Sequence, residues 1–253
     1  MIRVLLIAIF FIGPLTFGIP ASEQYQGDDL KIFERLQKTL TGHGEASFST
    51  LSRLGDKTVA IELMVSLDGN AQLSAEILQR PNEYWRWAQP GINDKPQGGS
   101  YRLKILSLNH APSKPENWLQ LQMAIHLPFL KMNVERDFEV TTRKDSSQVH
   151  TIKATAPLSN DSQLRQADIL IKSFSAPDRP QAIWMYVKAT ISVRSRVLYE
   201  ALPERLIASE TKDRIEQVMR NYQKEENRIK TLLADSFILE NRKKSQKSRQ
   251  TNR

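Results

Sequence analysis

The 253-residue sequence contains no cysteine. This absence excludes disulfides, thiol nucleophiles and thiolate metal sites, and it excludes a lipid anchor attached through cysteine. Small extracellular domains usually need disulfides, but a chain of this length can bury a sufficient core without them. The sequence therefore fits a protein that folds by core packing alone.

Motifs for metal binding and nucleophilic catalysis are also missing. The four histidines, His43, His110, His126 and His150, do not have the spacing of metal ligands. No Gly-x-Ser-x-Gly sequence, phosphate loop or His-Glu-x-x-His pattern occurs. We therefore predict no metal, no cofactor and no catalytic residue, and we expect a protein that is not an enzyme.

Positive charge is concentrated at the C-terminal end. Residues 241–253 contain six basic residues and neither an acidic nor an apolar side chain, which predicts a disordered tail. The tail supplies six of the eight net positive charges and Arg3 another, so the body has a net charge of one. We therefore expect no basic cluster on the body and no nucleic-acid partner. The tail either contacts anionic membrane surfaces or only aids solubility.

The first 21 residues have the three parts of a secretion signal. Arg3 precedes an apolar stretch from Val4 to Ile19, and small residues close the segment at Ala21. A retained membrane anchor is the competing interpretation, but the stretch is shorter than the ~20 apolar residues of a spanning helix and Pro14 would kink it. The pattern favours cleavage after Ala21 and a periplasmic or secreted protein.

The spacing of apolar residues predicts one domain over 28–240. Helical spacing occurs near both ends and after the second strand, and the remaining segments alternate like strands. Helices are predicted over 28–40, 71–88 with an interruption near Pro81, and 204–240; strands are predicted over 46–54, 59–67, 101–108, 118–127, 134–141, 148–156, 167–174 and 182–198. The short spacings favour an antiparallel meander, and hence an α+β protein.

Several predicted strands have one apolar face. In the strand over 118–127, Leu121 and Met123 alternate with polar residues, and in the strand over 182–198, Met185 and Val187 occupy the apolar face. A sheet with one apolar face and few helices to cover it must curl around something, and the closing helix is the natural lid. The pattern leaves open whether the enclosed space is a solid core or a cavity.

Arg136 shares the apolar face of its strand with Val134, Phe138 and Val140. An arginine on such a face is costly unless it is paired or faces a polar ligand. Two interpretations remain open, a structural ion pair and a polar anchor inside a pocket.

Three segments together resemble a known family. Leu127 to Val140, with Arg136-Asp137-Phe138 after a proline, Leu78 to Trp87, with its aromatic pair, and Ser173 to Ile207, with its last hairpin and helix start, resemble the START-like (helix-grip, SRPBCC) lipid-binding domain family. The resemblance covers about residues 30–235. It implies a helix-grip fold, in which a curved antiparallel sheet wraps around a long C-terminal α-helix and a hydrophobic cavity.

The resemblance also implies a function. It implies an exported protein that binds or carries a lipid or another hydrophobic small molecule without a catalytic step. By strand parity and by the family motifs, the expected cavity wall is Trp85, Trp87, Leu121, Met123, Phe129, Arg136, Phe138, Met185, Val187, Met219 and Tyr222. Two alternatives stay open: an envelope interaction protein with a filled core, and a cyclase or hydrolase of the helix-grip type.

Overall fold

The computed structural model describes eight ranges of the chain: residues 25–44, 46–69, 71–88, 102–127, 130–144, 149–179, 181–201 and 221–232. The predicted signal peptide (1–21) and basic tail (241–253) lie outside these ranges, as do Phe129 and Met219. Among the described residues, no helix is both long and apolar enough to cross a membrane.

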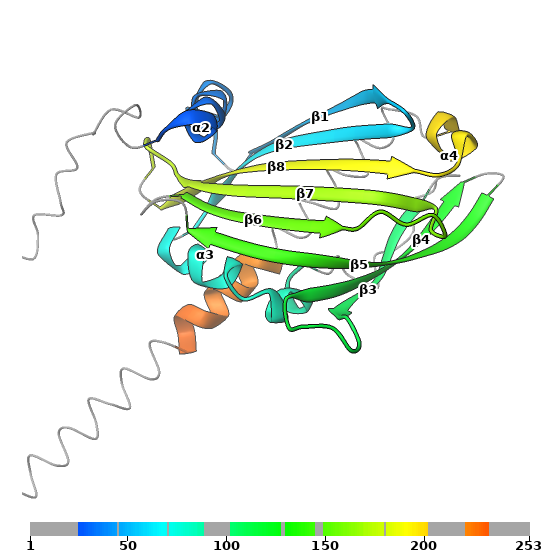
Figure 1. Ribbon diagram of the computed structural model, residues 1–253. Coiled ribbons are helices and arrows are strands. Elements are labelled where there is room, and N and C mark those ends of the chain that lie inside the picture. The colour runs from blue at the N-terminus through cyan, green and yellow to red at the C-terminus, as the bar shows by residue number, and fades with distance from the viewer. Residues whose placement is uncertain are drawn as a thin grey trace, which may run out of the picture.

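Eight antiparallel strands form one sheet in the order β1-β2-β8-β7-β6-β5-β4-β3 (Figure 1). Consecutive strands pair with each other except β2 and β3: β3 lies at the far edge of the sheet, and β8 pairs with β2. The strands are β1 (Ala46–Gly55), β2 (Thr58–Asp68), β3 (Arg102–His110), β4 (Trp118–Leu127), β5 (Leu130–Lys144), β6 (Val149–Ala156), β7 (Leu164–Ser175) and β8 (Ala182–Val193). The predicted α+β class and antiparallel meander are confirmed.

The described helices are α2 (Gly27–Leu40), α3 (Ala71–Leu78), the 3-10 helix η1 (Pro81–Arg86), α4 (Arg196–Ala201) and a helical segment over residues 221–232. In α2, Asp28 and Asp29 in the first turn complement the helix dipole. Pro81 begins η1, so the predicted helix over 71–88 is split at the expected place.

Two predicted strands differ most from the structure in their bounds. The last strand stops at Val193, and Arg196–Ala201 is the helix α4, where we predicted strand up to residue 198. β5 runs from Leu130 to Lys144 and so exceeds the predicted range at both ends. Pairing with β4 and β6 extends β5, and local alternation does not report such pairing.

The two faces of the sheet are covered by different helices. We call the face that carries Ile61, Met185 and Ile183 the inner face; α3, η1 and residues 221–232 pack against it. On the opposite, outer face, Phe33, Leu36 and Leu40 of α2 pack against Phe174 and Trp184. The expectation of a sheet with a single apolar face is therefore wrong where α2 covers the outer face, because Trp184 and Tyr186 are buried on that side.

Candidate functional site

The inner face of the sheet forms a continuous apolar floor. Strand register aligns inner-face residues of five adjacent strands in one row: Ile61, Ala189, Ile169, Ala154 and Val140. Because β2, β8, β7, β6 and β5 are neighbours, this row crosses the middle of the sheet without a polar side chain.

Two residues near the centre of this row have small side chains. Ala154 and Ala189 flank Ile169 in the register, and all three are only partly buried. An alanine between larger neighbours leaves space that a leucine or phenylalanine would fill. Other partly buried apolar residues surround them on the same face: Leu121, Met123, Met132, Ile171, Val187 and Ile191. Apolar area that stays accessible over several strands is typical of a binding surface.

Four predicted wall residues lie deep in the packed part of the inner side. Trp87, Phe138, Met185 and Tyr222 are each at most 5% exposed. The rings of Trp87 and Tyr222 are edge to face, with centroids 5.4 Å apart. This ring contact packs residues 221–232 against Trp87, the residue that follows η1.

Three further wall residues lie where the floor is accessible. Leu121 and Met123 of β4 and Val187 of β8 are partly buried and belong to the apolar clusters of the inner face. Trp85 lies in η1. The predicted set therefore contains both packed residues and part of an accessible floor.

Sequence reasoning missed the floor residues of the two central strands. Ala154 on β6 and Ile169 and Ile171 on β7 were not proposed, although each alternates with outward-facing residues. The alternation of Ala167, Ile169 and Ile171 was a usable signal. Only the register shows that these residues lie beside Val187 and Ala189.

Arg136 contacts a backbone carbonyl and forms no ion pair within 4.0 Å with any residue that the structure describes. Its Nη2 donates a hydrogen bond to the carbonyl oxygen of Pro157, just after the end of β6. Its buried Nε has no hydrogen-bond partner among the described residues. Burial lowers the pKa of Arg136, and the charge of Asp137 opposes this shift. Of the two interpretations, these contacts favour a structural role, with a carbonyl partner in place of an ion pair.

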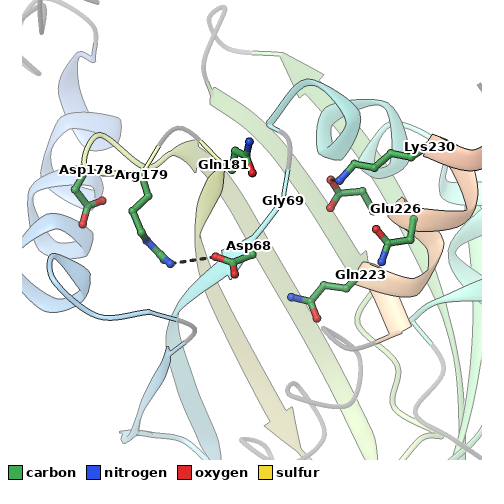
Figure 2. Close-up of a pocket in the computed structure, with 9 residues that line it drawn as sticks. Asp68, Gly69, Asp178, Arg179, Gln181, Gln223, Glu226 and Lys230 are labelled. Atoms are coloured by element: carbon green, nitrogen blue, oxygen red, sulfur yellow. Dashed lines mark hydrogen bonds and ion pairs between the residues drawn. The ribbon is translucent and has the colours of Figure 1, made fainter. Parts of the chain in front are cut away.

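A polar cleft of about 830 Å³ lies at one end of the sheet (Figure 2). On one side, Arg179 pairs with Asp68 at 3.0 Å; on the other, Lys230 pairs with Glu226 at 2.8 Å. Glu226 is only 2% exposed although it is ionisable. The full lining is Asp68, Gly69, Asp178, Arg179, Gln181, Gln223, Glu226, Asn227 and Lys230. Its charges are mixed, so the cleft offers both donors and acceptors to a polar group.

The body also carries a basic groove, contrary to our expectation. Six basic side chains line a groove of about 660 Å³ between α2 and the outer face: Lys31, Arg35, Arg143, Lys153, Lys172 and Lys188. The net charge of the body is small because acidic residues elsewhere offset these cations. Net charge does not report where charges gather, so the expectation of no basic cluster on the body is wrong.

Comparison with known proteins finds similarity in folds only. No family model and no curated protein matches the sequence. Among solved structures, a STAR-related lipid transfer protein from Xanthomonas axonopodis is similar over 71% of this chain and 99% of its own, with 11% identity and a TM-score of 0.45. A START superfamily protein from Mycobacterium smegmatis is similar over 68% and 98%, with 13% identity and a TM-score of 0.40.

A third similar structure is the Zhui aromatase/cyclase from a Streptomyces species. It covers 67% of this chain and 90% of its own, with 11% identity and a TM-score of 0.34. The single antiparallel sheet of the predicted α+β fold is confirmed by the strand order. Of the closing helix, residues 221–232 are described.

Proposed function

We propose that this protein binds a lipid or another apolar small molecule on the inner face of its sheet. The observation that carries the proposal is the row Ile61, Ala189, Ile169, Ala154 and Val140, whose central members are only partly buried. Accessible apolar side chains are normally few and scattered on a soluble protein. Here they adjoin one another across the sheet.

Burial of an acyl chain on the apolar floor gives enough free energy for weak binding. Burial of one methylene group contributes about 0.8 kcal/mol, so about ten methylenes of an acyl chain give a gross gain of about 8 kcal/mol. Ordering of the ligand and the protein reduces this gain by several kcal/mol, which leaves roughly millimolar affinity unless polar contacts add to it.

Binding in this proposal involves no chemical step. A carrier needs an apolar surface, a few polar contacts and a way for the ligand to leave. A bound molecule should therefore be recovered unchanged after incubation with the protein. Conversion of the ligand would instead support the cyclase or hydrolase alternative.

We further propose that the protein acts outside the cytoplasm, after cleavage behind Ala21. The segment Met1 to Ala21 supports this through its charge, apolar stretch and small closing residues. Amino-terminal sequencing of the protein from a periplasmic or culture fraction should begin at Ser22. A sequence beginning at Met1 in the membrane fraction would overturn this part of the proposal.

The direct test is to identify what the protein carries. The mature protein is purified from its native host without detergent and extracted with organic solvent, and the extract is analysed by mass spectrometry. A lipid in stoichiometric amount supports the proposal. An empty protein that also fails to bind fluorescent fatty acids would favour the envelope interaction protein.

A pair of variants locates the ligand on the floor. Ala189→Phe places a large ring in the central row, whereas Thr190→Phe places it on the outer face, one residue away on the same strand. We expect Ala189→Phe to weaken binding of a fluorescent fatty acid by tenfold or more and Thr190→Phe to leave it unchanged. Circular dichroism and thermal melts verify that both variants fold. Equal binding by the two folded variants would rule out the inner face as the site.

A further inference from the structure

A second binding site lies on the opposite side of the sheet from the apolar floor. The basic groove runs between α2 and the outer face of β5, β6, β7 and β8. Register places its sheet residues in two adjacent cross-strand rows. One row contains Thr141, Lys153, Leu170 and Lys188, and the other contains Arg143, Thr151, Lys172 and Tyr186.

The positive charge of the groove exceeds the negative charge of the acidic side chains that pair with it. Lys31 pairs with Asp28 and Lys172 with Asp29, while Arg35 and Lys188 share Glu62. Five of the six basic side chains, all but Arg143, therefore meet three acidic ones, which leaves an excess of two positive charges among them. Lys153 is exposed and forms no ion pair with any residue that the structure describes.

The excess is local to the groove. Two residues further along the strands, the next outer-face row contains Glu139, Thr155 and Asp168, so the charge changes sign within about 7 Å. A flat anionic bilayer would face both rows at once. A compact anion that enters between α2 and the sheet would meet the cations alone.

The remaining lining suits an anion with an organic part. Thr141 and Thr151 contribute hydroxyl groups, and Ile32 and Leu170 contribute apolar surface. Tyr186 donates a hydrogen bond to Glu62 Oε1 at 2.9 Å. Burial, together with that hydrogen bond, raises the pKa of Tyr186 to about 12, so its ring stays neutral.

We propose that this groove binds a phosphate ester, with Lys153 and Arg143 of the two rows as its main ligands. A phosphate monoester carries nearly two negative charges at neutral pH, which the excess of two positive charges in the groove can offset. Guanidinium and ammonium groups form strong charge-assisted hydrogen bonds with phosphate oxygens. The ester is either a soluble metabolite or the head group of a lipid, since both present the same chemistry.

The test titrates the mature full-length protein with glycerol 3-phosphate by isothermal calorimetry at low ionic strength. The double variant Lys153→Gln, Arg143→Gln is expected to bind about tenfold more weakly than wild type. Lys131→Gln, on the outer side of β5 but outside the groove, should bind like wild type. The basic tail is present in every variant, so differences between variants report on the groove.

A second experiment uses vesicles that contain phosphatidic acid. It distinguishes a soluble phosphate ester from a lipid head group as the ligand. Binding of glycerol 3-phosphate assigns a soluble ester; binding of the vesicles alone, with the same loss in the double variant, assigns a lipid head group. Equal affinity of the double variant and wild type for every phosphate probe would overturn the proposal. Ala189→Phe should leave phosphate binding unchanged, so this site and the apolar floor can fail separately.

Discussion

Gly69 and Glu226 are in close contact where the end of β2 meets residues 221–232 (Figure 2). A side-chain carbon added at Gly69 would lie 2.7 Å from Oε2 of Glu226 and 3.0 Å from Cδ1 of Ile183. Glu226 cannot move away freely, because it is 2% exposed and paired with Lys230 at 2.8 Å. The missing side chain at Gly69 therefore lets the helix approach the sheet.

Gly69→Ala should destabilise this contact. We expect the free energy of unfolding to fall by about 1–2 kcal/mol, because the added methyl group displaces either Glu226 or Ile183. Thermal or urea unfolding measures the loss. Gly44→Ala is the matched control, since an added carbon there has no neighbour within 4 Å. An equal effect of the two substitutions would show that Gly69 is not a packing point.

Glu62 should make stability depend on pH. Burial raises the pKa of Glu62, but hydrogen bonds from Arg35 and Tyr186 and the charges of Arg35 and Lys188 outweigh this and hold it below 4.5. The lowered pKa contributes stability above pH 4.5, which is lost as the pH falls through the folded-state pKa.

Glu62→Gln is therefore expected to cost about 1–2 kcal/mol at neutral pH, and the difference from wild type should shrink below pH 4.5. Urea unfolding at several pH values measures it. Glu34→Gln, at an exposed position of α2, is the control. A difference that stays constant down to about pH 3 would contradict the assignment.

Arg136→Gln should affect stability more than binding. The arginine joins β5 to the carbonyl of Pro157 beyond β6, and loss of this hydrogen bond is expected to cost about 1 kcal/mol. Lys131→Gln, exposed on the same strand, should cost little. Unchanged stability together with weaker binding of a fatty acid, but not of the matching fatty alcohol, would restore the polar-anchor interpretation.

Removal of residues 241–253 tests the basic tail. If the tail touches membranes, truncation should weaken binding to anionic vesicles, and the loss should be larger at low salt. Neutral vesicles serve as the control and should show no difference. Co-sedimentation of protein and vesicles measures both, and equal binding with and without the tail would leave it a solubilising segment.

The strands were predictable because each alternates with a period of two along its own length. Leu121 and Met123 on β4 needed no partner strand to be assigned to one face. The burial of Trp184 was not predictable in this way. Its strand has large apolar residues on both faces, and which helix covers the outer one depends on how the chain folds back.

The sequence alone determined the α+β character, the apolar faces of the strands, the absence of cysteine chemistry and the charge of the tail, since these depend on composition and local period. Tertiary structure decided where those faces meet. Ala154 and Ala189 become neighbours of Ile169 only through the pairing of β6, β7 and β8, and Lys153 and Arg35 share a groove only because α2 lies across the outer face. Such pairings join residues far apart in the chain, so no local pattern specifies them.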